Sequence, residues 1–345
     1  GDLTKIKTGK LDANASSEDG QYPFFTCSKE PLKISTYSYD CECVLVAGNG
    51  DLNVKYYNGK FDAYQRTYII ENNSDGKLYM PYLYLFMEEY VEELRRQAIG
   101  GVIKYIKLGN LTDAMIELPS VEEQRNIVKI LFKAKQILEQ REIELEKLDE
   151  LIKARFVEMF GNPDVNEKNW NVYKMEQLCE VGSSKRIYQN DQSLTGIPFL
   201  RISDLVNRMD TGSKDCDLFI PEELFEKFKK QGLVPARGDI LLTARGTLGR
   251  CYIIQDDDEF YFQDGMITWL SKFDEKITPL YISYLFEMPE FRKQIDSLQA
   301  GSTVAYLSIS MTKELNVMVP PLELQNQFAA FVAQTDKSKF DIHKF

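Results

Sequence analysis

The sequence predicts an α+β protein in which two similar mixed α/β domains are separated by long α-helices. Three observations lead to this prediction. The chain has 345 residues, which is long for one ordinary domain. Its second half repeats landmarks of its first half in the same order, and an uninterrupted helical segment lies between the repeats. With 43% hydrophobic and 12% aromatic residues the chain can form packed cores, so extensive disorder is not expected.

The repeat is clearest where each copy ends. Residues 100–108 (GGVIKYIKL) resemble residues 301–309 (GSTVAYLSI), which lie 201 positions later. Earlier landmarks also match: 45–52 (LVAGNGDL) with 241–248 (LLTARGTL), and Tyr22-Pro23-Phe24-Phe25 with Ile197-Pro198-Phe199-Leu200. The offset grows from 175 to 196 between these two landmarks, so the second copy has 21 extra residues there, as expected of a loop insertion. The sequence therefore predicts related domains at 1–119 and 162–320.

Each copy is expected to mix strands and helices. The short apolar runs 240–242 and 251–254 flank a glycine-rich turn and predict a β-hairpin. Residues 82–97 and 281–298 each have the apolar spacing of a helix, and a strand-like stretch follows that ends at Pro119 or Pro320.

Residues 120–161 are predicted to form a long connecting helix. Apolar residues recur every three or four positions, without an interrupting proline or glycine, in a background rich in glutamate, lysine and arginine. Ser120 and Glu123 can form a capping box, and Gly161 ends the helix. Such a helix would span about 60 Å. The alternative is a solitary helix stabilised by surface ion pairs. The residues predicted to face a partner helix are Ile127, Leu131, Leu138, Leu145, Leu148 and Ile152.

A second helix is predicted at 321–345, with Phe328 and Phe331 on its apolar face. It corresponds to the start of the connecting helix and is expected to pair with it as an antiparallel coiled coil over about half its length. Gly1 aligns with a point near Leu178 in the second copy, so we expect the first domain to be trimmed at its N-terminus and the last helix to be short or truncated.

Several catalytic classes are disfavoured. The single histidine, His343, leaves no Ser-His-Asp or Cys-His arrangement. The sequence has no phosphate-binding loop of the form GxxxxGK[ST] and no Asn/Asp-Pro-Pro-Tyr run typical of amino-methyltransferases. The net charge of −11 disfavours non-specific coating of nucleic acid, although it permits reading through base contacts. We therefore expect a chain without a catalytic site of its own.

No metal site is expected. The Cys41-x-Cys43 pair lacks further ligands nearby, and the acidic run 256–259 is better explained as a solvated hairpin tip. The six cysteines show no disulfide or zinc spacing, and neither a signal peptide nor a long apolar run is present. These features favour a cytoplasmic protein with reduced cysteines.

The whole arrangement resembles the specificity subunit of type I restriction-modification systems. The residues that carry the resemblance are 116–124 (IELPSVEEQ), 317–325 (VMVPPLELQ), 199–204 (FLRISD), 238–246 (GDILLTARG) and the helix end 156–161 (FVEMFG). Each motif is weak alone, but their duplicated order extends over essentially the whole chain.

The resemblance implies a subunit that binds double-stranded DNA, with each domain reading one half of a split target. The helices would act as a ruler between the half-sites and as docking surfaces for two methyltransferase subunits, through which motor-nuclease subunits join. It also implies that S-adenosylmethionine, ATP and magnesium belong to the partner subunits and that this chain binds no cofactor. A rigid spacer is a physically sensible ruler because separation along B-DNA corresponds to a number of base pairs.

The turn 243–247 is the leading candidate for reading DNA. An arginine suits a guanine edge or a phosphate, and the equivalent Asn49 would suit adenine. For every candidate, an ordinary solvated side chain is the alternative interpretation. The residues predicted to contact DNA are Lys10, Thr26, Ser28, Lys29, Asn49, Gly101 and Lys104 in the first domain, and Lys185, Arg186, Arg201, Ser203, Thr243, Arg245, Thr247, Ser302 and Thr303 in the second.

Two other functions remain open at this point. A non-enzymatic coiled-coil adaptor that binds protein partners is slightly favoured by the acidic charge balance but disfavoured by the glycine-flanked arginine and threonine turns. An autonomous nuclease or methylase would be active as an isolated chain, and we expect no such activity.

Overall fold

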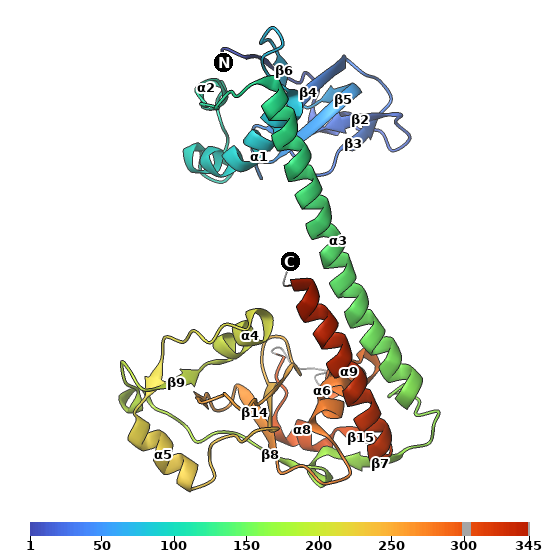
Figure 1. The fold of residues 1–345 in the computed structure, drawn as a ribbon, viewed down its shortest axis with the longest axis vertical. Helices are drawn as coiled ribbons and strands as arrows, with labels where there is room; N and C mark the ends of the chain where they lie inside the picture. Colours follow the sequence, from blue (N-terminus) through green and yellow to red (C-terminus); the bar gives the residue numbers. More distant parts are fainter. Residues whose placement is uncertain (299–304, 344–345) are drawn as a thin grey trace. The chain divides into compact units, whose positions relative to one another are not determined.

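The computed structural model describes residues 1–298 and 305–343. Contacts divide the chain into two units, Gly1–Gln140 and Arg141–Phe345, each of which is described by itself. The boundary falls inside the long helix α3 (Val121–Phe160), which is drawn in green in Figure 1. Among the described residues, none of the helices is long and apolar enough to cross a membrane.

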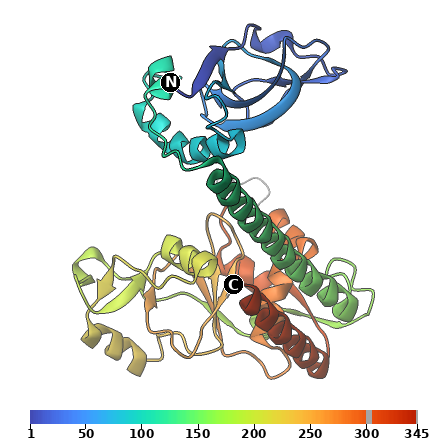
Figure 2. The ribbon, with the colours of Figure 1, turned by 45° about the horizontal axis from the view of Figure 1, so that its top comes forward.

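The first unit is built on a six-stranded sheet in the order β1-β6-β4-β5-β2-β3. Neighbouring strands are antiparallel except β2 and β5, which run parallel. Figure 2 shows these strands curving around one another. The elements are β1 (Thr4–Thr8), the 3-10 turn η1 (Ala13–Ala15), β2 (Tyr22–Phe25), β3 (Leu32–Ile34), β4 (Tyr39–Ala47), β5 (Val54–Ala63), β6 (Thr67–Asn72), α1 (Met80–Gln97) and α2 (Leu108–Thr112).

Strand β4 is the central apolar strand of this sheet, and both of its faces are packed against other side chains. Its residues 43–47 are consecutive apolar residues, and all of them are buried. Val44 and Val46 pack in a cluster with α1, whereas Cys43 and Leu45 pack on the opposite face with aromatic side chains such as Phe61. A continuous apolar run is expected where both faces of a strand are covered.

The second unit contains a four-stranded sheet in the order β12-β11-β14-β8, a three-stranded sheet β10-β9-β13 and the pair β15-β7. Its largest apolar cluster joins the end of α3 to α6, α7 and α9. The elements are β7 (Asn171–Lys174), η2 (Met175–Gln177), β8 (Glu180–Gly182), η3 (Gln189–Asp191), β9 (Ile197–Leu200), α4 (Ile202–Thr211), β10 (Phe219–Ile220), α5 (Glu222–Lys230), β11 (Ile240–Thr243), β12 (Cys251–Ile253), β13 (Tyr261–Phe262), β14 (Ile267–Ser271), α6 (Pro279–Glu287), α7 (Pro289–Leu298), α8 (Ile309–Glu314), β15 (Asn316–Val319) and α9 (Leu322–His343).

The predicted duplication is confirmed by the strand order. The series β1-β6-β4-β5 of the first unit corresponds to β8-β14-β11-β12 of the second, with the same antiparallel pairing. Likewise β2 pairs antiparallel with β3 and parallel with the end of β5, as β9 pairs antiparallel with β10 and parallel with β13, so the single strand β5 corresponds to the two strands β12 and β13. Helices α4 and α5 lie between β9 and β11, so the insertion predicted from the offsets adds helical structure to the second copy.

Two expectations about single elements were wrong. Residues 281–298 form two helices instead of one, because Pro289 has no amide hydrogen and holds Met288 in an extended conformation at φ −70° and ψ 124°. Residues 116–119 are not a strand, although the equivalent β15 is one. β15 is held by pairing with β7, and no strand of the described first unit pairs with 116–119.

Candidate nucleic-acid interface

The predicted reading turn of the second unit connects β11 to β12. These strands pair antiparallel, so the hairpin expected from the sequence is confirmed. Arg245 is exposed at the tip, and its guanidinium carbon lies 4.9 Å from the centre of the Tyr306 ring. The backbones of these two residues form an isolated antiparallel bridge, and the Leu307 amide donates to the Ala244 carbonyl at 3.0 Å. The turn is therefore fixed to the segment that precedes α8.

The first unit has the same arrangement at the equivalent positions. Asn49 forms an antiparallel bridge with Tyr105, and the Ile106 amide donates to the Gly48 carbonyl at 2.9 Å. Gly50 follows at φ +70°, a conformation that favours glycine, and its amide donates to the Lys104 carbonyl at 2.9 Å. In each domain a hairpin turn and a second loop thus form one composite surface, which we call the two-loop surface (Asn49 with Tyr105, and Arg245 with Tyr306).

An arginine contact that occurs in both domains holds the backbone of each turn. Arg95 donates to the Leu52 carbonyl at 2.9 Å, and Arg292 donates to the Leu248 carbonyl at 2.6 Å. Both arginines lie on the helix region that follows the sheet, on α1 and α7 respectively. The duplicated contact indicates that the two turns are held by the same local architecture.

The hydroxyl of Thr243 is not available for contact with a ligand in this structure. The residue is fully buried, and its Oγ1 donates to the Thr247 carbonyl at 2.5 Å and accepts from the Arg250 amide at 2.9 Å. Thr243 therefore supports the turn, which corrects its placement among the DNA contacts. Thr247 is exposed two positions after Arg245 and stays a predicted contact residue.

The remaining basic candidates differ in how they are paired. Arg186 forms an ion pair with Asp264 at 2.8 Å, and Arg201 forms ion pairs with Asp204 and Asp217. Phosphate would have to compete with these carboxylates. By contrast, Arg245 has no carboxylate partner within residues 1–298 and 305–343, and its guanidinium lies over the Tyr306 ring.

In the first unit, Lys10, Lys29 and Lys104 are exposed and form no ion pair with any described residue. Thr26 is buried, and its hydroxyl accepts from the amide of Ser28, which is exposed. The other exposed candidates are Gly101, Lys185 and Ser203. Ser302 and Thr303 lie outside the described residues.

The predicted coiled coil is present over the C-terminal part of α3. Phe156 and Phe160 lie 5.5 and 5.4 Å from Phe328 of α9, measured between ring centres. Nearer the other end of α9, Lys339 pairs with Asp149 at 2.5 Å, so the two helices run antiparallel, as seen in Figure 1. Phe331 is half-buried, with the Arg155 guanidinium 5.8 Å from its ring. The solitary-helix alternative is wrong for this part of α3.

The α3 residues predicted to face a partner helix, here called the seam, therefore divide into a buried or half-buried group and an exposed group. Ile152 is buried, and Leu145 and Leu148 are half-buried. Ile127, Leu131 and Leu138 are exposed by 37%, 43% and 63%. The capping box is confirmed, because the Glu123 carboxylate accepts from the Ser120 amide at 2.9 Å and the Glu123 amide donates to Ser120 Oγ at 3.3 Å.

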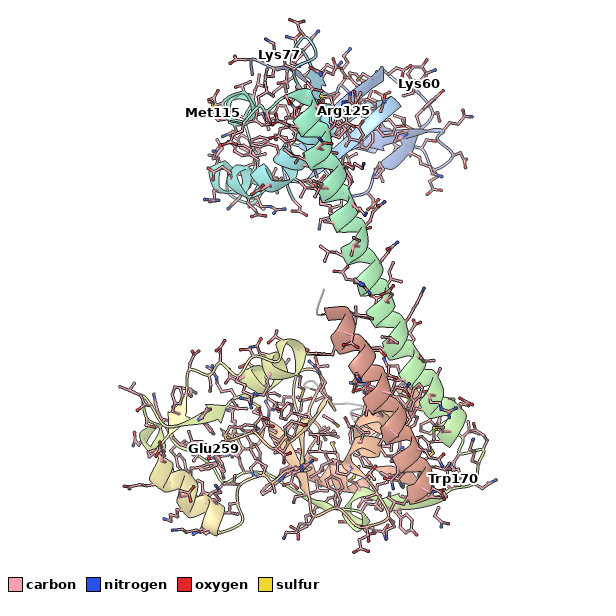
Figure 3. The ribbon with its side chains drawn as sticks, in the orientation of Figure 1. Lys60, Lys77, Met115, Arg125, Trp170 and Glu259 are labelled. Carbon is pink, nitrogen blue, oxygen red and sulfur yellow. The ribbon has the colours of Figure 1, made fainter. Side chains whose placement is uncertain are left out.

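The C-terminal end of α3 is held by Trp170, whose indole Nε1 donates to the Phe160 carbonyl at 2.8 Å. Figure 3 labels this tryptophan beside the ends of α3 and α9. Gly161 follows Phe160 at φ +84°, as expected of a residue that ends a helix.

Sequence reasoning missed a buried ion pair in the second unit. Asp258 belongs to the acidic run that was expected to be a solvated tip, but its carboxylate is buried and pairs with Arg208 at 2.9 Å. The Tyr252 hydroxyl and the Gln255 amide also donate to it. The partner arginine lies 50 positions earlier, so local sequence gave no signal. No cluster of potential metal ligands was found among the described residues.

Comparison with known proteins identifies a family and several relatives that this chain resembles. A family model described as "Type I restriction modification DNA specificity domain" matches residues 1–147 and 167–344. The EcoDI specificity subunit of Escherichia coli is 40% identical over 153 residues, which are 44% of this chain and 34% of that protein. A putative type I specificity subunit of Haemophilus influenzae, S.HindORF215P, is 25% identical over 91% of this chain and 80% of its own length.

Solved structures agree with the fold. The type I restriction-modification S subunit from M. genitalium superimposes with a TM-score of 0.62 at 16% identity, over 99% of this chain and 89% of that one. A chain from a type I restriction-modification complex superimposes with a TM-score of 0.51 at 14% identity, over 99% and 95%. Because the family model matches both halves of the chain, this protein belongs to the type I restriction-modification DNA specificity family.

Proposed function

We propose that this chain reads a split target in double-stranded DNA, with the two-loop surface of each domain facing one half-site. The observation that carries the proposal is the pair Asn49 and Arg245, which occupy the same place in two domains of the same topology. An amide suits adenine and a guanidinium suits guanine, so different side chains on one scaffold would read different half-sites.

Exposed lysine and arginine side chains near these surfaces support contact with DNA despite the net charge of −11. Lys104 lies next to the first two-loop surface, and its backbone carbonyl holds Gly50. Lys10 and Lys29 are further exposed cations of the same domain. In the second domain Arg245 and Lys185 are the exposed cations without a carboxylate partner among the candidates that the structure describes. Such residues suit phosphate positioning around a base-reading turn.

We further propose that α3 and α9 dock the subunits that carry the chemistry, two methyltransferase subunits and, through them, motor-nuclease subunits. S-adenosylmethionine, ATP and magnesium would be bound by those partners. The exposed seam residues Ile127, Leu131 and Leu138 support this part of the proposal, because exposed apolar residues gathered along one helix commonly mark a protein interface. The competing adaptor function has no comparable support in the comparisons, since the relatives are specificity subunits.

The experiment uses the full chain in complex with its methyltransferase subunits, incubated with a plasmid library of random sequence. We expect methylated adenines in a motif of two short blocks separated by unspecified bases. Arg245→Ala should relax or change one block only, with each lost bidentate base contact reducing discrimination by about 1–3 kcal/mol.

Arg237→Ala is the matched control, because Arg237 is an exposed arginine of the same domain that is paired with Asp256 at 3.2 Å. It should leave both blocks unchanged. An Arg245→Ala complex that methylates the wild-type motif at the wild-type rate would show that this turn does not face a base.

A further inference from the structure

Each long helix begins with a buried glutamine that is bonded to the domain before it. Gln124 lies in the first turn of α3, and its side chain is fully buried. Its Oε1 accepts from the Tyr79 amide at 2.8 Å, and its Nε2 donates to the carbonyls of Lys77 and Pro119 at 2.8 and 2.9 Å. Figure 3 labels Lys77 and the neighbouring Arg125, whose guanidinium covers the Tyr79 ring at 4.4 Å.

Gln325 repeats this arrangement in the first turn of α9. Its Oε1 accepts from the Thr278 amide at 2.8 Å, and its Nε2 donates to the carbonyls of Lys276 and Pro320, both at 2.9 Å. The partners occupy equivalent positions in the two copies, directly before α1 or α6 and directly before the long helix. Gln325 Oε1 also accepts from Thr278 Oγ1 at 3.1 Å. We call each set of three bonds to backbone atoms a glutamine clamp.

The clamp permits one orientation of the amide. Both Nε2 hydrogens meet a carbonyl and Oε1 meets an amide hydrogen, so rotating the amide by half a turn would oppose like groups at all three positions. Because the side chain is buried, these bonds form in a low-dielectric environment where an unpaired polar group is costly. Each clamp therefore ties three segments together: the start of the domain helix, the proline segment and the start of the long helix.

We propose that Gln124 and Gln325 are positioning residues that fix the direction in which each long helix leaves its recognition domain. The functional part of this inference rests on the proposed function: a fixed exit direction restricts the complex to one spacing between half-sites. A helix as long as α3 extends about 60 Å. A tilt of about 5° at its start would move its far end by about 5 Å, more than one base-pair step of about 3.4 Å.

The first experiment measures the exit direction without DNA. Spin labels on a ketone-bearing unnatural amino acid are placed at Lys60 and Gln136, two exposed positions of the first unit on β5 and α3. The distance distribution should be narrow in the otherwise native chain and clearly broader in Gln124→Leu. Gln140→Leu, at an exposed position of the same helix, is the control and should not broaden it. An unchanged distribution in Gln124→Leu would overturn the positioning role.

The second experiment measures spacing with the methyltransferase complex. Duplexes carry the mapped half-sites at the native spacing or with one base pair added or removed. We expect Gln124→Leu and Gln325→Leu to lower the ratio of methylation rates between native and altered spacing by about tenfold, which corresponds to a loss of about 1.4 kcal/mol in the preference for one spacing. Gln327→Leu, an exposed position next to the second clamp, should preserve the ratio.

A general loss of stability would lower all rates together and leave this ratio unchanged, which would overturn the role in spacing. If the leucine variants do not fold, Gln124→Glu keeps the shape of the side chain and leaves at most one of the two donors, and it should give the same two effects. If the wild-type complex shows no bipartite target, the proposed function fails, and a broadened distance distribution would still support the positioning role.

Discussion

Removal of the Phe328 ring tests the helix pairing that the second unit requires. The side chain is fully buried, and its ring centre lies 5.5 Å from Phe156, 5.4 Å from Phe160 and 5.3 Å from Tyr284. Replacing a buried phenylalanine by alanine typically costs about 3–5 kcal/mol, because the transfer free energy is lost and a cavity remains. The edge-to-face geometry of all three ring contacts places Phe328→Ala toward the upper part of that range.

The assay is urea unfolding followed by tryptophan fluorescence. The chain has 2 tryptophans, Trp170 and Trp269, and both belong to the second unit, so the signal reports that unit alone. With an m-value of about 2 kcal/mol/M, a loss of about 4 kcal/mol lowers the midpoint by about 2 M. Phe340→Ala, at a residue of the same helix that is 60% exposed, should shift the midpoint by less than about 0.5 M. Equal shifts for the two variants would refute the packing of α9 on α3.

Three further predictions concern single residues of the second unit. Asp258→Ala should destabilise it by about 3–5 kcal/mol in the same assay, because the buried Arg208 loses its partner; an effect below about 1 kcal/mol would show that the charge is solvated. Burial raises the pKa of Asp239, so the folded state binds this proton more tightly than the unfolded state, and the stability it contributes is lost as the pH rises above about 4. Asp239→Asn should therefore flatten the dependence of stability on pH above about pH 4 and stabilise the unit at neutral pH, since one amide oxygen can accept from both the Ala236 amide and the Trp269 indole; an unchanged slope would contradict this. Tyr281→Phe should cost about 1–3 kcal/mol, because the buried Met318 carbonyl loses its donor, and urea midpoints equal to those of the native chain would count against that bond.

The large-scale organisation could be predicted because it depends on patterns that repeat. The duplicated landmarks, the hairpin after β11 and the limits of α3 follow from glycine turns, apolar spacing and the Ser120–Glu123 capping box, all of which are local signals. Pro289 was an equally local signal that should have divided 281–298 into two helices.

The rest depends on contacts between distant residues, which spacing alone does not reveal. Thr243 looked like a contact residue, yet the hairpin folds its hydroxyl back onto Thr247. Asp258 belongs to a hydrophilic run, and only the folded chain brings Arg208 to it. Gln124 and Gln325 occupy matching positions at the starts of two predicted helices. Their role, however, depends on hydrogen bonds to backbone carbonyls more than 40 positions earlier in the sequence.

The candidate DNA surface remains a prediction at the level of single residues. The structure brings the Asn49 and Arg245 turns into equivalent positions and removes Thr243 from the contact set. It also separates cations that are already paired, such as Arg186 and Arg201, from Arg245, which stacks on Tyr306. These differences rank the candidates for DNA contact. A cation such as Arg186 or Arg201 would have to give up an ion pair within the protein in order to bind phosphate or a base, and Arg245 would not.

We propose that the chain contains two copies of one DNA-recognition domain and that each copy recognises its own half of the target. The most direct test replaces residues 1–119 by a second copy of 162–320 and maps the adenines methylated by the resulting complex. We expect a target with two identical half-sites, both equal to the block that Arg245→Ala alters in the native chain. A target that keeps the native first half, or a single continuous motif, would contradict it.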